Sequence, residues 1–320
     1  MNILILGGAG FLGNNLIRLC LKKLNTKIVV VDSLDPRLKS NLYNLKDVLN
    51  KIKFIKGDIR NAKLMAKTVK NQDIIFNCAA QTSHPLSLKN PFLDVEINCL
   101  GNLTVLEAVK KYNKKARLIY TSSSTLIGKA RDESVDEKHS EKPLDIYSAN
   151  KGIVEKYYYI YGKVHGLTTL SLRFANLYGP YGKGSPDFGF INYFIDLANR
   201  NKEITIFGSG RQKRNVMFVE DAAELLYRCA LRKDIFNDVY FAVHREHYSI
   251  YEIAKTIVKV FNKGILKRIP WPDIRKKIEI DNVIISGAKL FYKINWEPKY
   301  NLENGLIKTK LIIDSQTKKN

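Results

Sequence analysis

The first thirteen residues place the strongest constraint on the fold. An apolar run at residues 2–6 leads directly into a turn with glycine at positions 7, 8, 10 and 13, and a helical pattern extends from Phe11 to about Lys23. In such a turn Gly7 permits the sharp change of direction, Gly10 lets the backbone approach a diphosphate, and Gly13 lets the helix pack close to the strand. The helix N-terminus offers unpaired N–H groups to the phosphates. The pattern therefore predicts a dinucleotide site on a parallel α/β sheet.

Strand-like and helix-like segments continue to alternate through the first half of the chain. Further strand-like runs cover residues 27–32, 53–55, 73–78, 117–121 and 168–173, and long helical patterns cover 91–112 and 146–165. Continuous apolar strands between helices are typical of a parallel sheet that is covered on both faces. We therefore predict an α/β fold with a doubly wound parallel sheet of the Rossmann type.

The character of the sequence changes after Arg173. Residues 178–189 are rich in Gly, Pro and Tyr, which is typical of a long loop, and the elements beyond them look shorter and less regular. We predict that residues 1–173 form the dinucleotide-binding domain and that 174–320 form mostly a smaller, C-terminal substrate domain. This second domain is expected to be discontinuous, with the strand-like residues 239–243 returning to the main sheet.

An acidic residue, Asp32, ends the second strand-like run. A carboxylate there can accept hydrogen bonds from both ribose hydroxyls and repels a 2′-phosphate, so it favours NAD over NADP. Arg37 and Lys39 lie close by in the sequence and keep NADP open. Asp58, followed by Ile59, comes shortly after the third run, where an aspartate could reach the adenine amino group. A purely structural role in a turn is the alternative for both aspartates.

Tyr147 and Lys151 stand four residues apart on the helical pattern 146–165, a spacing that places both side chains on one helix face. Free tyrosine has a pKa near 10 and is a poor base at neutral pH, but a nearby ammonium favours the phenolate and lowers that pKa. Residues 122–124 are three serines that close the run beginning at 117. Hydroxyls at the end of a parallel strand face the ligand crevice, although serines can also simply form turns. Together with the glycine turn, these residues predict a catalytic site.

Further motifs accompany the glycine turn and the Tyr147/Lys151 pair. With them the chain resembles the extended short-chain dehydrogenases/reductases, specifically the NAD-dependent epimerase/dehydratase family that acts on nucleotide sugars. The resemblance covers nearly the whole chain. The residues that carry it are Gly7–Gly13, Asp32, Asp58, Asn77–Ala80, Asn98, the three serines, Arg173–Pro180, Ile206–Gly210 with Arg214, and Trp296–Pro298.

The resemblance implies a role for each matching residue. Tyr147 and Lys151 are the catalytic pair, Ser123 is the hydroxyl that hydrogen-bonds the reacting sugar oxygen, and Asn98 supports the helix that carries Tyr147. Contacts with NAD are implied for Gly7, Gly10, Phe11, Leu12, Gly13, Asp32, Asp58, Ile59, Ala79, Ala80, Asn98, Tyr147 and Lys151. Contacts with the substrate, a nucleotide-diphosphate sugar, are implied for Ser123, Ser124, Tyr147, Asn176, Arg214 and Arg275.

The chain departs from the family pattern at four positions. Dehydratases of the family carry Asp-Glu just after the catalytic hydroxyl, and decarboxylases carry a Glu in the second of these positions. Here the two positions are Ser124 and Thr125, and neither can act as a carboxylate acid/base. Ile127 replaces the usual Tyr, and Asn215 replaces the usual Asp after Arg214. These departures leave the cofactor chemistry unaffected and leave the substrate open.

The resemblance implies an epimerase that oxidises a sugar carbon transiently and reduces it again from the other face. Carbon 4 is the commonest site in the family. A 4,6-dehydratase, a keto-sugar reductase and a 2-epimerase are the alternatives, the last because Arg211–Arg214 and Asn90–Asn98 are similar to 2-epimerases of CDP-deoxyhexoses. A relative that binds RNA without catalysis is a further alternative, which the retained Tyr147, Lys151 and Ser123 disfavour.

The composition restricts the class of protein further. Lys plus Arg number 53 against 31 for Asp plus Glu, giving a formal charge of +22, but the lysines are scattered, so we expect no nucleic-acid partner. No CxxC pair occurs among the four cysteines, so we expect buried thiols and no metal site. No apolar run approaches the roughly 18 residues that span a bilayer, and no signal peptide is recognisable. We expect a cytoplasmic protein without a membrane partner.

A homodimer is also expected by the resemblance. Family members often dimerise through two long helices, here 91–112 and 146–165, which together form a four-helix bundle. The tyrosines among residues 157–161 fit such an interface.

Overall fold

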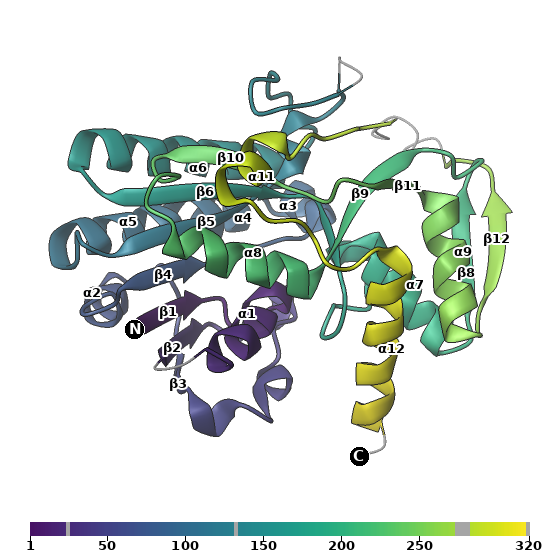
Figure 1. Cartoon of the computed structure of the whole chain (residues 1–320), viewed down its shortest axis with the longest axis horizontal. Coiled ribbons are helices and arrows are strands. Elements are labelled where there is room, and N and C mark those ends of the chain that lie inside the picture. The colour runs from purple at the N-terminus through teal and green to yellow at the C-terminus, as the bar shows by residue number, and fades with distance from the viewer. Residues whose placement is uncertain (24–25, 131–133, 273–281, 318–320) are drawn as a thin grey trace.

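The computed structural model describes residues 1–23, 26–130, 134–272 and 282–317. Its centre is a seven-stranded, fully parallel sheet with the order β10-β6-β5-β4-β1-β2-β3 (Figure 1). The predicted α/β class with a doubly wound parallel sheet is therefore confirmed. The strands are β1 (Asn2–Leu6), β2 (Lys27–Asp32), β3 (Lys53–Lys56), β4 (Ile74–Asn77), β5 (Arg117–Ser123), β6 (Thr168–Phe174) and β10 (Asp238–Ala242).

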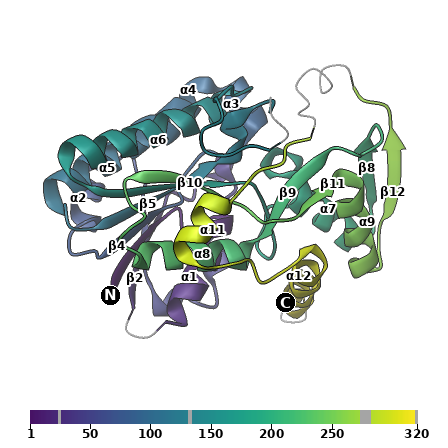
Figure 2. The ribbon, with the colours of Figure 1, turned by 45° about the horizontal axis from the view of Figure 1, so that its top comes forward.

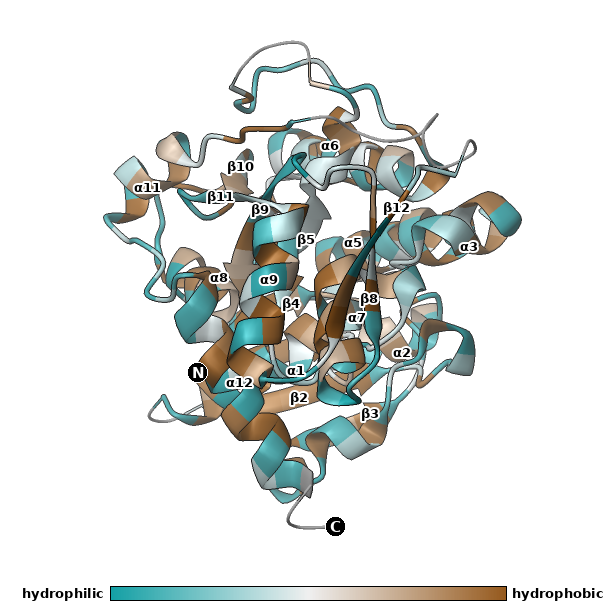
Figure 3. Ribbon diagram, turned by 90° about the vertical axis from the view of Figure 1, so that its right-hand side faces the viewer, coloured by the Kyte–Doolittle hydropathy of each residue, from teal (hydrophilic) through white to brown (hydrophobic). Residues whose placement is uncertain are grey.

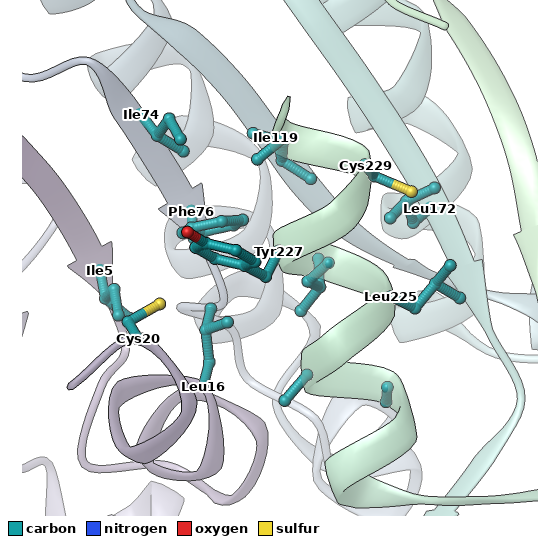
Figure 4. Packing of buried hydrophobic residues seen from close by; sticks show 14 of the residues in the cluster. Ile5, Leu16, Cys20, Ile74, Phe76, Ile119, Leu172, Leu225, Tyr227 and Cys229 are labelled. Carbon is teal, nitrogen blue, oxygen red and sulfur yellow. The ribbon is translucent and has the colours of Figure 1, made fainter. Parts of the chain in front are cut away.

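Helices cover both faces of this sheet (Figure 2). The side chains of β1 show how the layers are built, because Ile3 and Ile5 belong to one core cluster and Leu4 and Leu6 to the other. The first cluster lies under α1 (Phe11–Leu21), α8 (Val219–Leu231) and α11 (Ala288–Ile294), and Figure 4 shows Tyr227 of α8 packed beside Phe76 of the sheet. The second cluster lies under α2 (Ala62–Thr68), α5 (Gly101–Tyr112) and α6 (Ile146–His165).

The long helix predicted over residues 91–112 is divided in the structure. α4 (Pro91–Asp94) and α5 are joined by a π-helical segment, η4 (Val95–Leu100). Within it, the Asn98 amide donates to the Gln81 carbonyl (3.0 Å) and accepts from the Gln81 N–H (3.0 Å). A wider turn at such a position is a common way to direct one buried side chain out of the helical register. α3 (His84–Lys89) precedes this segment.

The second region of the molecule, which follows β6 in the chain, is built around two small sheets. One has the order β11-β9-β7 and the other pairs β12 with β8. Their strands are β7 (Asn176–Tyr178), β8 (Glu203–Phe207), β9 (Lys213–Phe218), β11 (His247–Ser249) and β12 (Ile265–Ile269), and the accompanying helices are α7 (Phe190–Asn199), α9 (Ile250–Phe261) and α12 (Leu302–Thr317). Figure 3 shows hydrophobic and hydrophilic residues alternating along α9 and α12, whose inner sides share one core cluster with α7.

The chain returns from this second region to the main sheet. β10 pairs with β6 at the sheet edge, and α8 and α11 pack over the same face as α1. The helices after Arg173 are as regular as those before it, in contrast to the expectation, because amphipathic faces on α8 and α9 bury large apolar clusters. No helix in the described ranges is long and apolar enough to cross a membrane.

Candidate active site

The carboxyl ends of the central strands open onto a cavity. β2 and β3 lie on one side of β1, and the chain then crosses to β4 on the other side, so the strand order reverses at β1. Ligands bind parallel α/β sheets at such a switch point. The predicted site residues that line the cavity are Gly7, Gly10, Phe11, Leu12, Gly13, Asp32, Asp58, Ile59, Ala79, Ala80, Ser123, Ser124, Tyr147, Lys151 and Asn176.

The glycine turn has no room for side chains. Gly7 has φ +76°, and a Cβ on it would lie 2.7 Å from the backbone of Ala79. A Cβ on Gly13 would lie 2.3 Å from the carbonyl oxygen of Gly7, so the helix packs directly on the turn. α1 begins without a side-chain cap and without an acidic residue in its first turn. Its N-terminal N–H groups therefore remain available to an anion in the cavity.

Asp32 closes β2 and is 5% exposed. Its carboxylate accepts from the Ala9 N–H (2.9 Å), the Leu34 N–H (2.9 Å) and the Ser40 hydroxyl (3.0 Å). The side chain thus holds the glycine turn against the end of β2 while it still lines the cavity. The structural and the ligand-binding interpretations of Asp32 are therefore compatible.

Asp58, Arg37 and Lys39 each have a hydrogen-bonding partner in the protein. Asp58 accepts two side-chain hydrogen bonds from Arg60, and although burial opposes it, this pairing keeps the Asp58 pKa below its ordinary value. Arg37, whose position in the sequence left NADP open as a possible cofactor, forms an ion pair with Asp35 (2.6 Å). Lys39 donates to the Ser185 hydroxyl (3.0 Å). Neither Arg37 nor Lys39 lines the cavity.

Tyr147 and Lys151 lie side by side on the first two turns of α6, which Asp145 caps by accepting from the Ser148 N–H (2.8 Å). Lys151 is 2% exposed, its ammonium donates to the Thr121 carbonyl (2.8 Å), and it lies 5.7 Å from the centre of the Tyr147 ring. Burial lowers the pKa of Lys151 to about 8. Burial raises the pKa of Tyr147 above its ordinary value, and the hydrogen bond with Ser123 opposes this rise. The lower tyrosine pKa expected from the sequence is therefore not reached by these residues alone.

One ionisable pair beside Tyr147 was not predicted from the sequence. The imidazole of His84 contacts the Tyr147 ring edge-on, with 4.7 Å between the centroids, and its Nδ1 lies 2.6 Å from the Asp145 carboxylate. His84 also lines the cavity. An imidazole oriented by a carboxylate is a common proton-transfer group. Because residues 84 and 145 are far apart in the chain, no local pattern could have revealed the pair.

Comparison with known proteins identifies the family. Residues 3–240 match the sequence model described as the NAD dependent epimerase/dehydratase family. The chain belongs to this family.

Its relatives in the family have several activities. A CDP-paratose 2-epimerase from Salmonella typhi is 28% identical, over 96% of this chain and 98% of that protein. A dTDP-D-glucose 4,6-dehydratase from Dictyostelium discoideum is 34% identical, over 81% of this chain and 62% of that one. The structure of the Thermus thermophilus UDP-glucose 4-epimerase in complex with NAD is 25% identical, covers 97% of both chains and superposes with a TM-score of 0.85.

NAD is the cofactor of this family, as the sequence predicts. The cavity fits a dinucleotide, because among the described residues a Cβ on Gly10 would meet only the Gly7 oxygen (3.1 Å) within 4 Å, and Gly10 lines the same cavity as Asp32, beside the uncapped end of α1. Lys151 and Tyr147 lie at the β5 side of this cavity. In the sheet, β5 lies three strand spacings, about 14 Å, from β2, the strand that ends at Asp32.

The residues expected at the substrate are only partly brought together. Ser123, Ser124 and Asn176 line the cavity, and the Asn176 amide donates to the Asn215 carbonyl (3.0 Å). Arg214 lies on β9 outside the cavity lining. Arg275 lies outside the described residues. Ser123, Thr125 and Ser148 share a chain of hydroxyl hydrogen bonds of 2.8 Å each.

Two of the departures from the family pattern have structural explanations. The Asn215 amide donates to the carbonyls of His244 (2.6 Å) and Glu246 (3.2 Å), and a carboxylate could not donate to either. Ile127 is buried in a small apolar cluster with Phe241 and Val243. Neither side chain lines the cavity: Asn215 holds the segment 244–246 by hydrogen bonds, and Ile127 fills an apolar cluster.

Asn98 is fully buried and does not line the cavity, although its resemblance to family members implies a cofactor contact. Its amide donates to Asp94 (2.9 Å), and Asp94 also accepts from Asn150 (2.8 Å), which lies between Tyr147 and Lys151 on α6. This network connects η4, the loop after β4 and the helix of the catalytic pair.

Proposed function

We propose that this chain is a nucleotide-sugar epimerase that inverts carbon 4 of the sugar by transient oxidation. The observation that carries the proposal is the composition of the cavity around Tyr147. Ser123, Lys151 and Tyr147 meet there, whereas the carboxylates that line the described cavity are Asp32 and Asp58, at the ends of β2 and β3. The described residues of the site can therefore exchange a hydroxyl proton, but none of them places a carboxylate acid for elimination at the end of β5.

Each side chain has a part in this reaction. Tyr147 removes the proton from the sugar hydroxyl and returns it after the keto sugar has presented its other face. Ser123 hydrogen-bonds the same oxygen, and Lys151 stabilises the phenolate. When bound, NAD would accept the hydride from the sugar carbon and give it back to the other face, so that no net oxidation results, and its positive ring would favour the phenolate. We expect the substrate, a nucleotide-diphosphate sugar, to contact Ser123, Ser124 and Asn176 in the cavity. The family resemblance adds Arg214, which lies outside the cavity lining, and Arg275, which lies outside the described residues.

A 4,6-dehydratase is the second candidate, and one observation favours it. The His84–Asp145 pair lies against Tyr147 and could protonate a leaving hydroxyl in place of the missing carboxylates at 124 and 125. Elimination also needs a base at the neighbouring carbon, and Ser124 and Thr125 cannot supply one. Epimerisation requires no further group, so we favour it.

A panel of nucleotide sugars tests the proposal. UDP-glucose, UDP-galactose, UDP-N-acetylglucosamine, dTDP-glucose and CDP-sugars are incubated with the NAD-loaded protein, and the products are read by NMR. We expect at least one pair of sugars to interconvert with a single inverted carbon, which also identifies that carbon. A product with a new keto or 6-deoxy group would favour the dehydratase instead.

A further inference from the structure

The loop after β7 reaches across the dinucleotide groove. Residues 179–189 connect β7 with α7, yet two of their side chains contact the segment after β2. The Lys183 ammonium donates to the Leu38 carbonyl, and the Ser185 hydroxyl accepts from Lys39 (3.0 Å). These residues are about 145 positions apart in the chain, so the two hydrogen bonds join the region of the small sheets to the main sheet.

Lys183 is the member of this loop that enters the cavity. It lines the cavity together with the glycine turn, Asp32 and Leu38, and its ammonium lies 4.1 Å from the centre of the Phe188 ring. Lys39 does not line the cavity. Of the residues that line the described cavity, Lys183 and Lys151 carry the two ammonium groups, and Lys151 is already placed beside Tyr147.

Among the described residues, no carboxylate pairs directly with the Lys183 ammonium, whose partners are the Leu38 carbonyl and the Phe188 ring. Its hydrogen bond goes to a neutral carbonyl, and burial lowers its pKa to about 8. Asp32 favours the charged form at longer range, but its carboxylate is already occupied by Ala9, Leu34 and Ser40. A desolvated cation is costly unless an anion pairs with it. The ligand of this groove carries such an anion, its diphosphate.

We propose that Lys183 binds the diphosphate of NAD, opposite the N-terminus of α1, and thereby fastens the loop 179–189 over the dinucleotide. The phosphates would then lie between backbone N–H groups from one region of the molecule and an ammonium from the other. Binding of the cofactor would organise the wall of the substrate site, because Phe188, Gly189 and Phe190 line the same cavity. The inference depends on NAD binding alone and is independent of the reaction proposed above.

Calorimetric titration of NAD into the cofactor-free protein, without any sugar, tests the contact. We expect Lys183→Met to raise the Kd for NAD by about 10- to 100-fold, the range for a lost hydrogen bond to a charged group. Lys183→Arg should recover most of the affinity because it restores the charge. Lys39→Met is the matched control, since it removes the neighbouring hydrogen bond to Ser185 but no cavity charge. Because the Lys39 charge lowers the pKa of Lys183, its removal should not weaken NAD binding by more than about threefold. Equal losses in the two methionine variants, or no recovery with arginine, would overturn the proposal.

A series of ligands locates the contact on the dinucleotide. ADP and ADP-ribose contain the diphosphate, and adenosine does not. Lys183→Met should weaken ADP and ADP-ribose as much as NAD, should leave adenosine unchanged, and should reduce the salt dependence of NAD binding. An equal loss for adenosine would show that Lys183 contacts the ribose or adenine instead. Hydrogen exchange supplies a second readout: NAD should protect residues 179–189 in the wild type and in Lys183→Arg, and should not protect them in Lys183→Met.

Discussion

Lys151 combines a buried charge with a position beside the catalytic phenol. The side chain is 2% exposed, and burial lowers its pKa to about 8, although Asp94 and Glu155 favour the charged form. The unfolded chain binds this proton with the ordinary lysine pKa, near 10.4. Between these two values the unfolded state holds more protons than the folded state, so stability rises with pH there, and the full cost of burying the charge is present below pH 8.

Lys151→Met removes the buried charge and roughly preserves the length of the side chain, so it should remove the cost of burying that charge. We expect the free energy of unfolding at pH 7 to increase by about 1–3 kcal/mol. The advantage over the wild type should shrink as the pH rises from 8 toward 10, while turnover is lost at every pH. Urea denaturation at pH 7 and pH 9.5 measures both values. A variant that is less stable than the wild type at pH 7 would contradict the prediction.

Asp32 gives the second prediction at this scale, because it holds the glycine turn and lines the cavity. Asp32→Ala should weaken NAD binding by about 10-fold or more, since hydrogen bonds to a charged group are lost, and should reduce the discrimination against NADP. Ser40→Ala is the control, because it removes one donor to the carboxylate and leaves the charge in place. Fluorescence titrations with NAD and NADP measure the ratio. If the wild type bound NADP at least as tightly as NAD, the role of Asp32 would be wrong.

At the scale of elements, the sequence predicted what depends on local periodicity. β1, β2 and α6 have the expected bounds, because apolar runs, the Asp145 cap and Gly166 define them within a few residues. The π-helical break at η4 was not expected, since it depends on Asn98 meeting Gln81. His84 with Asp145 and Lys183 with Leu38 were missed for the same reason. The first pair is separated by 61 positions in the chain and the second by 145, so neither contact can be recognised in a local sequence pattern.

The helical segments α4, η4, α5 and α6 form the surface on which we propose a homodimer. Large apolar side chains are exposed along α4, η4 and α5 and along α6, and the two rows lie side by side because α6 packs on η4 and α5. The exposed members are Phe92, Val95, Leu100 and Tyr112 in the first row and Ile153, Tyr159, Ile160 and Val164 in the second. Exposed apolar side chains that lie together in this way are typical of an interaction surface.

A charge in this surface tests the dimer. Among the tyrosines at 157–161, Tyr159 is the most exposed (52%), and Tyr158 is buried in the core. We expect Tyr159→Glu to convert the dimer to a monomer at micromolar concentration, because an unpaired carboxylate would be buried in the interface. Tyr292→Glu, on α11, is the control, since that tyrosine is 91% exposed and lies on another element. Light scattering of the wild type showing a monomer would remove the proposal.

At the scale of the whole molecule, the site is assembled from both regions of the chain. The main sheet and its helices supply the glycine turn, Asp32, Ser123 and the Tyr147/Lys151 pair, and the segment that follows β6 supplies Asn176 and Lys183. The residues from the main sheet belong to sequence motifs, and for this reason they could be predicted as site residues from the sequence. In the second region, Arg214 and Asn215 lie on β9 outside the cavity lining, where their side chains donate to the carbonyls of Lys213 and His244. The substrate therefore cannot be predicted from the motifs.

The central claim is that the protein inverts a sugar carbon through Tyr147 and removes no atom from the substrate. Mass spectrometry of a turned-over nucleotide sugar, for the wild type and for Tyr147→Phe with its bound NAD quantified, tests this claim most directly. We predict a wild-type product of unchanged mass and a loss of turnover of at least about 10²-fold in Tyr147→Phe, with NAD retained. A product lighter by one water or one CO₂, formed only when Tyr147 is present, would contradict the claim and identify elimination or decarboxylation as the reaction.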